Sequence, residues 1–196
     1  MEPLARSIVT PEEYLALERA AEHRSEYING QIFALAGGNR QHNQITVNIA
    51  GELNSQFRGR TCTVYVSDMR VKVSPTGLYT YPDVVAVCGE PLVEDDHLDT
   101  LLNPTVIMEV LSDSTEAYDR GGKFAHYRRL PSLKEYVIIA QDQARVEHFV
   151  RQDAQWVMTE IDDLTGTLSL DSIGCRLPLL EIYDKVEFPA TTPARS

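Results

Sequence analysis

Apolar positions recur with two different periods along this chain, and each period predicts a kind of element. A spacing of four residues predicts an amphipathic helix over 41–57. The apolar residues of that helix face are Ile45, Ile49, Leu53 and Phe57. A shorter helix is expected over about 10–21, because Thr10 and Glu13 have the spacing of a capping box and Pro11 suits a first turn.

Alternating apolar runs predict strands. Asn29-Gly30 separates two short alternating runs and therefore favours a hairpin over about 25–35. Three β-rich runs are separated by turn residues, so we expect a meander of strands at 61–66, 69–73 and 79–88. Further strand-like runs lie near the end of the chain, at 146–151, 156–161, 168–170 and 179–186.

Two near-continuous apolar runs, at 104–111 and 135–140, are typical of strands that are buried on both faces. A helix is expected between them, prepared by Ser114 to Glu116 and by Asp119 and extending to about Arg129. A strand, a helix and a strand in this order imply a right-handed parallel crossover.

This order of elements predicts an α/β fold. Its core is a mixed β-sheet flanked by helices over about 40–142, with a helix and a hairpin before it and an antiparallel β extension over about 145–188. The chain has 196 residues, of which 43% are hydrophobic, which is enough for a proper core. Because no long linker or internal repeat interrupts the pattern, we expect a single domain over 1–196.

Charge and segment composition narrow the classes of function. The chain carries 18 Lys and Arg against 29 Asp and Glu, a formal net charge of −11, which repels nucleic acid at long range. The net charge does not exclude binding of nucleic acid through a local basic patch or through bound cations. Salt screens distant charges, so the charges close to the nucleic acid dominate its binding. With no signal-like leader and no apolar run of about 18 residues, we expect a cytoplasmic protein without membrane contact.

Three cysteines, Cys62, Cys88 and Cys175, lie far apart in apolar or strand-like stretches. None has a second cysteine or a histidine at the spacing of a zinc site. We expect all three to be buried free thiols.

Two carboxylates fall on apolar faces. The period of two places Asp83 on the face of Val85 and Val87, and it places Glu109 on the face of Ile107 and Leu111. Burying an unpaired carboxylate costs several kcal/mol, so each needs a cation, a salt bridge or a proton. A divalent metal would satisfy both carboxylates at once. The alternative is two ordinary buried salt bridges, or strand ends that reach water.

The surrounding order of elements resembles the PD-(D/E)xK nuclease core, in which a Pro-Asp opens one strand and a glutamate lies in the next central strand. More closely, about Val9 to Phe188 resembles the Uma-type restriction endonuclease family. The segments that carry this resemblance are Glu26-Tyr-Ile-Asn-Gly, the helix with His42, Tyr81-Pro-Asp-Val, Glu109-Val-Leu-Ser-Asp-Ser-Thr, Asp119-Arg-Gly-Gly-Lys and Glu135-Tyr-Val. The resemblance implies a restriction-endonuclease-like core and the hydrolysis of phosphodiester bonds with Mg²⁺ or Mn²⁺.

The resemblance also implies roles for residues. Asp83 and Glu109 would be catalytic metal ligands, joined by the backbone carbonyl of Val110, and their hard oxygen atoms suit Mg²⁺. The lysine of the motif is missing, because the residue two positions after the glutamate is Leu111. Lys123 is the nearest substitute.

On the expected helix, Lys123 shares a face with Tyr127 at a spacing of four. The alternative for Lys123 is an exposed lysine near the start of a helix.

Several further residues are accessory candidates. Glu26 would reach the metal or pair with a basic residue, His42 would act as a base, bind phosphate or be a hydrogen-bonded core residue, and Asp68 would be a third acid or a turn former. Gly37 and Gly38 lead into a helix N-terminus that could receive a phosphate. Cations expected to border the substrate are Arg40, Arg70, Lys72, Arg120, Arg128 and Arg129, whereas the acidic connector 94–99 should lie away from it.

The leading hypothesis is therefore a metal-dependent endonuclease that acts on DNA, as a homodimer if it cuts both strands. One alternative is a nuclease fold with weak or no catalysis that serves as a binding or regulatory module, which Leu111 and the net charge favour. Another alternative is a metal-dependent hydrolase of a different phosphate ester.

Overall fold

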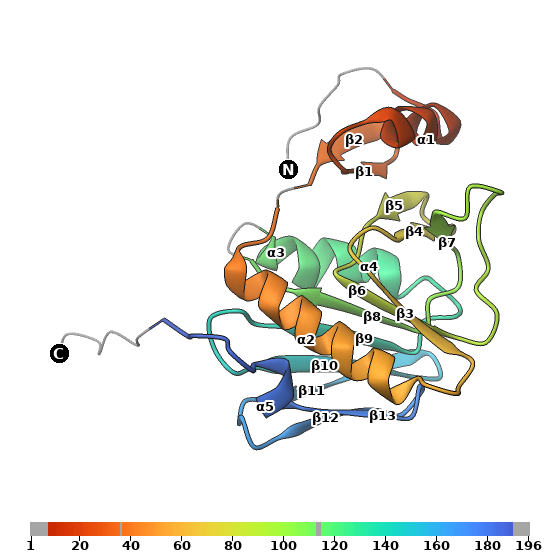
Figure 1. The fold of residues 1–196 in the computed structure, drawn as a ribbon. Coiled ribbons are helices and arrows are strands. Elements are labelled where there is room, and N and C mark those ends of the chain that lie inside the picture. The colour runs from red at the N-terminus through yellow and green to blue at the C-terminus, as the bar shows by residue number, and fades with distance from the viewer. Residues whose placement is uncertain (1–7, 36, 113–114, 190–196) are drawn as a thin grey trace.

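The computed structural model describes residues 8–35, 37–112 and 115–189 of the chain. They form a mixed α/β fold with a six-stranded sheet, a five-stranded sheet and a small two-stranded sheet. The six-stranded sheet lies at the centre, and the N-terminal elements lie above it in Figure 1. The described helices include none that is both long enough and apolar enough to cross a bilayer.

The N-terminal unit consists of helix α1 (Pro11–Ala20) and a hairpin of strands β1 (Ser25–Ile28) and β2 (Gln31–Ala34). The capping box of α1 and the hairpin turn at Asn29-Gly30 are confirmed; both turn residues have positive φ, as this type of turn requires. Tyr14 and Tyr27 stack on each other and contact Tyr79. This aromatic cluster anchors α1 to the five-stranded sheet, of which the hairpin forms two strands.

The five-stranded sheet continues from the hairpin in the order β2-β1-β5-β4-β7. Its remaining strands are β4 (Arg70–Val73), β5 (Leu78–Thr80) and β7 (Thr100–Leu101), and β7 runs parallel to β4. The acidic connector leads into β7, and Asp99 accepts hydrogen bonds from Arg19 of α1. This ion pair holds α1 to the connector.

The six-stranded sheet has the order β11-β10-β9-β8-β6-β3. Central strand β8 is buried along its whole length and runs parallel to β9, which confirms the predicted parallel pairing. The other pairs are antiparallel. The bounds are β3 (Cys62–Val66), β6 (Val84–Cys88), β8 (Val106–Val110), β9 (Glu135–Ile139), β10 (Val146–Gln152) and β11 (Gln155–Ile161).

Different elements cover the two faces of this sheet (Figure 1). On one face lies helix α2 (Arg40–Gln56), whose predicted apolar residues are all buried, with helix α5 (Leu179–Ile182) beside it. Strands β12 (Thr167–Leu170) and β13 (Cys175–Pro178) complete that layer. On the other face lie α3 (Glu116–Tyr118), the π-helix η1 (Asp119–Lys123) and α4 (Phe124–Tyr127). The predicted helix start at Ser114 lies outside the described residues.

Two predictions about strands were wrong. The runs 61–66, 69–73 and 79–88 form no meander, because β3 pairs with β6 in the six-stranded sheet whereas β4 and β5 belong to the other sheet. Run 79–88 is interrupted at Pro82, which lacks the N–H that a continuous ladder would use. Residues 179–186 begin as helix α5, where Leu179, Ile182 and Tyr183 bury one helical face in the core.

The cysteine prediction was also partly wrong. Cys62 and Cys88 lie opposite each other in the β3–β6 pair and form a disulfide. Cys175 is a buried free thiol, as predicted.

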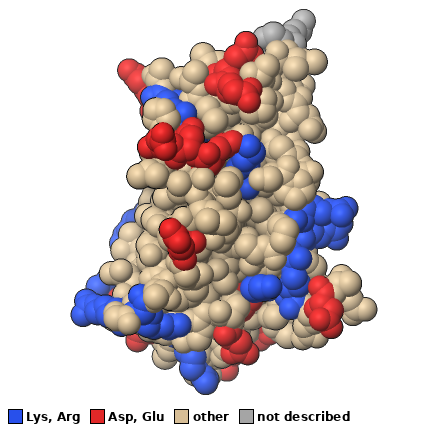
Figure 2. Space-filling model, turned by 90° about the vertical axis from the view of Figure 1, so that its right-hand side faces the viewer, with Lys and Arg blue, Asp and Glu red and all other residues tan. Residues whose placement is uncertain are grey.

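Charged side chains are unevenly distributed on the face shown in Figure 2. Acidic side chains gather in its upper third, at the level of the N-terminal unit, while most Lys and Arg lie in the lower half. On this face the negative charge is therefore not spread uniformly.

Candidate active site

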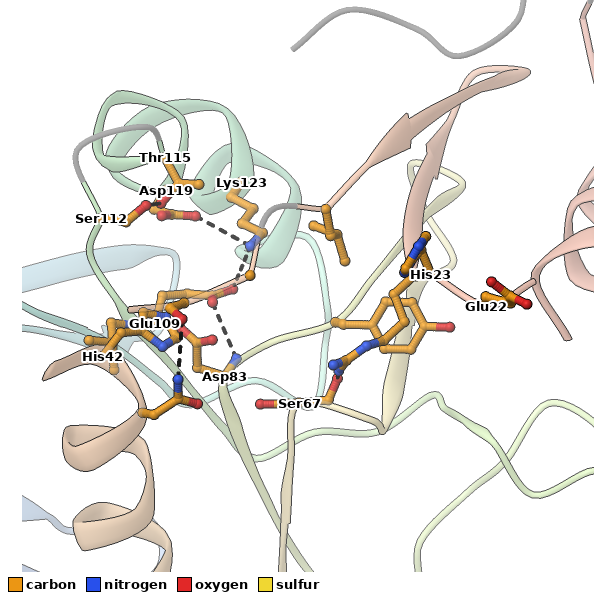
Figure 3. A pocket seen from close by; sticks show the side chains of 17 residues that line it. Glu22, His23, His42, Ser67, Asp83, Glu109, Ser112, Thr115, Asp119 and Lys123 are labelled. Carbon is orange, nitrogen blue, oxygen red and sulfur yellow. Dashed lines mark hydrogen bonds and ion pairs between the residues drawn. The ribbon is translucent and has the colours of Figure 1, made fainter. Parts of the chain in front are cut away.

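A cavity of about 340 Å³ lies where the N-terminal unit approaches the ends of β6 and β8. Figure 3 shows Asp119, Lys123, Glu109 and His42 on one side of it and Ser67, His23 and Glu22 on the other. Its lining comprises Glu22, His23, Arg24, Leu35, Gly37, Gly38, His42, Asn43, Ser67, Tyr81, Asp83, Glu109, Val110, Ser112, Thr115, Asp119 and Lys123.

Asp83 occupies the break between β5 and β6, just before the first residue of β6. Its Oδ2 accepts a hydrogen bond from the backbone N–H of Val110 at 2.8 Å and lies 3.1 Å from Nε2 of His42. Its backbone carbonyl accepts a hydrogen bond from the N–H of Ser67 at 3.1 Å. Asp83 is thus held through its side chain and its backbone.

His42 reaches Asp83 from the first turn of α2. Asn39 caps this helix and accepts a hydrogen bond from the His42 N–H. Burial opposes protonation of His42, but the hydrogen bond and the charge of Asp83 outweigh it and raise the pKa of the imidazole. His42 is therefore a hydrogen-bond partner of Asp83 in the lining of the cavity.

Glu109 lies on β8 beside Asp83 and is 2% exposed. Its Oε1 accepts a hydrogen bond from the Tyr127 hydroxyl at 2.7 Å, and its Oε2 lies 3.3 Å from the backbone N of Asp83, which donates to it. Burial raises the pKa of the Glu109 carboxyl, against the opposing effect of the Lys123 charge. The two predicted carboxylates are therefore neighbours on one side of the cavity.

Lys123 lies within a group of carboxylates and is 6% exposed. Its Nζ is 3.1 Å from Glu109 Oε1, 3.3 Å from Asp119 Oδ1 and 3.5 Å from Glu26 Oε1. Burial alone would lower the pKa of Lys123, but the surrounding carboxylates raise it, so the ammonium stays charged. This placement excludes the alternative of an exposed surface lysine. Leu111 instead packs in the apolar cluster that contains Ile107 and Tyr127.

The π-helix η1 directs both Asp119 and Lys123 inward, where both are buried. Two glycines lie within it. A Cβ on Gly122 would come within 2.7 Å of the Tyr118 ring, whereas a Cβ on Gly121 would meet nothing within 4 Å. Gly122 therefore permits the close approach of Tyr118, and Gly121 provides a matched control.

Replacing Gly122 by Ala is expected to lower the free energy of unfolding by about 1–3 kcal/mol relative to Gly121→Ala, because the added methyl group overpacks the Tyr118 ring. The gain in helix propensity is common to both variants and cancels in the comparison. Urea unfolding measures the difference. Equal stability of the two variants would show that the Tyr118 contact does not constrain η1.

The other predicted acids have definite partners. Buried Glu26 contacts Lys123 and accepts a hydrogen bond from the Thr80 hydroxyl, so it pairs with a basic residue instead of lining the cavity. Asp68 is exposed in the turn after β3 and forms an ion pair with Arg24 at 2.9 Å. It acts as a turn residue there and lies outside the cavity.

The predicted substrate-binding arginines do not reach the cavity. Arg70 is buried, donates to the Tyr81 hydroxyl and the Thr100 hydroxyl, and leaves no guanidinium surface for a ligand of the cavity. Arg120 pairs with Glu116 and Glu147, and Arg40 is exposed at the start of α2 but is not among the lining residues. The acidic connector lies outside the lining, as predicted.

Asp119 and Arg24 are two cavity residues that the sequence does not single out as site residues. Asp119 belongs to an expected helix start and to the segment Asp119-Arg-Gly-Gly-Lys of the family resemblance, and in the structure it lines the cavity and contacts Lys123. Arg24 carries no motif, and only the pairing of distant segments brings it to the cavity. The spacing of four between Asp119 and Lys123 was the one available signal.

The donor set of the site fits a small divalent cation. Asp83 and Glu109 are adjacent oxygen donors at the cavity, and Mg²⁺ commonly binds through one or two carboxylates together with water. Three carboxylates, Glu26, Glu109 and Asp119, contact Lys123, and Asp83 lies beside Glu109, so carboxyl groups outnumber the one ammonium in this region. Among the described residues no group of three His, Cys, Asp or Glu is arranged to hold a metal, so a site here would rest on the two carboxylates Asp83 and Glu109.

Comparison with known proteins gives three results. The model of the Uma2 family, described as "Putative restriction endonuclease", matches residues 11–179. Two uncharacterized proteins of Synechocystis sp. are similar: sll1609 is 39% identical over 155 residues, covering 79% of this chain and 88% of that protein, and slr1290 is 33% identical over 181 residues, covering 92% and 94%.

A crystal structure described as "a putative nuclease belonging to DUF820", from Anabaena variabilis, has a TM-score of 0.76 at 18% identity and covers 91% of this chain and 99% of that one. At this identity the likeness shows a shared fold.

Proposed function

The chain belongs to the Uma2 family, and from that premise we propose that it is an endonuclease that hydrolyses phosphodiester bonds in DNA with Mg²⁺ or Mn²⁺. In this proposal the six-stranded sheet with α2 and η1 is a restriction-endonuclease-like core. Cutting both strands of a duplex would require two copies of the site, which a two-fold homodimer would supply.

One observation carries the proposal: Asp83 and Glu109 meet at the cavity, with Lys123 3.1 Å from the glutamate. Two oxygen donors and an ammonium in one cavity are the groups that phosphodiester hydrolysis needs, because negative charge develops on the phosphate during attack by water. Position 111 holds leucine, and the ammonium beside Glu109 in the described structure is that of Lys123 from η1. The resemblance to a nuclease fold agrees with this assignment.

Each residue has a proposed task. Asp83 and Glu109, with the Val110 carbonyl, would hold the cation, which when bound would polarise the phosphate and lower the pKa of a water molecule. His42 and the Val110 N–H fix the orientation of Asp83, and Tyr127 fixes that of Glu109. Lys123 would offer its charge to the developing negative charge on the phosphate oxygens.

Hydrolysis assays would distinguish the proposed endonuclease from the two alternatives, a binding module and a hydrolase of another phosphate ester. With Mn²⁺, the protein is expected to nick supercoiled plasmid DNA and to hydrolyse bis(p-nitrophenyl) phosphate, a small diester, and chelation of the metal should stop both reactions. Asp83→Asn should be inactive, which excludes a contaminating nuclease. Hydrolysis of p-nitrophenyl phosphate alone would favour a phosphomonoester hydrolase, and DNA binding without hydrolysis would favour a binding module.

A further inference from the structure

The cavity has two Lys or Arg residues in its lining, Lys123 and Arg24, and they differ in what they can offer a ligand. Lys123 is nearly inaccessible and is engaged by three carboxylates. The side chain of Arg24 is 46% exposed, and it comes from the segment between α1 and β1 on the N-terminal unit. Arg24 is therefore the cation of the lining that an entering anion can contact.

The guanidinium of Arg24 is fixed at one edge. Nη1 lies 2.9 Å from Asp68 Oδ1 and also donates a hydrogen bond to the Ser67 carbonyl. The guanidinium lies over the Tyr81 ring, with Cζ 5.7 Å from the ring centroid. Within the described part of the chain, Nε and Nη2 of Arg24 donate no hydrogen bond. The Nε–Nη2 edge is the pair of donors with which arginine binds a phosphate in bidentate fashion.

Ser67 links this guanidinium to the candidate catalytic aspartate. Its carbonyl accepts from Arg24, while its N–H donates to the Asp83 carbonyl at 3.1 Å. Ser67 has φ of +31°, a conformation that non-glycine residues rarely adopt, and this turn directs its carbonyl and its N–H to different partners. One residue therefore sets the position of Arg24 relative to Asp83.

An anionic substrate needs a cation on the side of the cavity where Ser67 lies. Carboxylates of Glu22, Asp83, Glu109 and Asp119 line it, and the chain has a net charge of −11. A bound metal would neutralise charge only beside Asp83 and Glu109. Arg24 lies with Ser67 and Tyr81, and Ser67 lies across the cavity from Glu109 in Figure 3.

We propose that Arg24 binds a phosphate of the nucleic acid backbone that flanks the scissile phosphate, and that Ser67 and Asp68 position its guanidinium for this contact. This inference rests on the proposed function. It predicts that the loss of Arg24 impairs the reaction of a polynucleotide more than that of a small diester, because bis(p-nitrophenyl) phosphate has no flanking phosphate.

The test compares Arg24→Ala with Arg58→Ala, which removes an exposed arginine beyond the C-terminal end of α2. Binding of a fluorescein-labelled oligothymidylate is measured over a salt series with Ca²⁺ in place of Mn²⁺. Arg24→Ala should bind about tenfold more weakly, and its plot of log affinity against log salt should be shallower by about 0.7, the value for one lost contact to a single strand. Arg24→Lys should keep the salt slope of the parent but bind the oligonucleotide more weakly. Lysine keeps the positive charge but cannot donate the two parallel hydrogen bonds of a guanidinium.

Hydrolysis of bis(p-nitrophenyl) phosphate separates the possible failures. Arg24→Ala should lower kcat/KM for DNA at least about tenfold more than kcat/KM for this diester, mainly through a higher KM for DNA. If the parent hydrolyses the diester and Arg24→Ala retains the salt slope of Arg58→Ala, this inference is wrong and the proposed function stands. If the parent neither hydrolyses the diester nor binds the oligonucleotide, the proposed function is wrong, and so is this inference, which rests on it.

Discussion

Lys123→Met is expected to lower the free energy of unfolding by about 3–5 kcal/mol in the absence of metal, which is the cost of removing one partner from a buried ion pair. The variant removes the ammonium that contacts Glu109, Asp119 and Glu26, and these carboxylates are almost fully buried. Methionine fills a similar volume, so lost packing contributes little. Urea unfolding at neutral pH with a chelator present measures the effect.

Lys134→Met is the matched control, because Lys134 is exposed just before β9. A surface substitution of this kind usually changes stability by less than about 0.5 kcal/mol. A loss below about 1 kcal/mol for Lys123→Met would mean that the carboxylates hold protons and do not depend on the lysine. Under the proposed mechanism the same variant should also lose hydrolysis of bis(p-nitrophenyl) phosphate, because no other lysine or arginine contacts Glu109 in the described structure.

Local signals predicted the elements that depend on neighbouring residues. The Thr10 capping box, the Asn29-Gly30 turn and the apolar stripe of α2 each act within a few residues, and all three are confirmed. The face of Glu109 followed from strand alternation, because Ile107 and Leu111 do pack in one cluster with Val85 and Val87. The proximity of Asp83 and Glu109 then follows from the pairing of β6 with β8.

Features that depend on long-range pairing could not be predicted in this way. A three-residue turn at 67–69 separates β3 from β4, yet the two strands enter different sheets, and no local pattern distinguishes this from a hairpin. The disulfide follows from the same pairing, since β3 and β6 bring Cys62 and Cys88 opposite each other. The position of Arg24 likewise depends on contacts with residues more than 40 positions away.

The surroundings of Lys123 combine both kinds of information. Its spacing of four from Asp119 and from Tyr127 is visible in the sequence, and both residues belong to the cluster around Glu109. The burial of the lysine depends on the packing of η1 against the sheet and on Glu26 from the N-terminal unit. Lys123 can therefore be identified from the sequence, whereas its ion pairs are visible only in the three-dimensional structure.

Glu109→Gln is expected to reduce Mn²⁺ affinity at least about 100-fold, which exceeds the usual effect of an outer-shell residue. Glutamine has nearly the same shape and can still accept the hydrogen bond of the Tyr127 hydroxyl, so the fold should be retained. The Mn²⁺ affinity would fall because Glu109→Gln removes one of the two carboxylates that the cavity offers as anionic oxygen ligands.

Glu135→Gln is the matched control for this change. Glu135 is a buried carboxylate on the adjacent strand β9, but it pairs with His148 and lies outside the cavity lining. Its replacement by glutamine should leave Mn²⁺ affinity unchanged, even if it lowers stability. Loss of Mn²⁺ affinity in Glu135→Gln would point to a general disturbance of the sheet.

The most direct test of the central claim is a calorimetric titration with Mn²⁺ of the parent, Glu109→Gln and Glu135→Gln. We predict that the parent and Glu135→Gln take up one Mn²⁺ with the same affinity and that Glu109→Gln takes up none in the same concentration range. Equal uptake by all three proteins, or no uptake by the parent, would contradict the assignment of Asp83 and Glu109 as metal ligands.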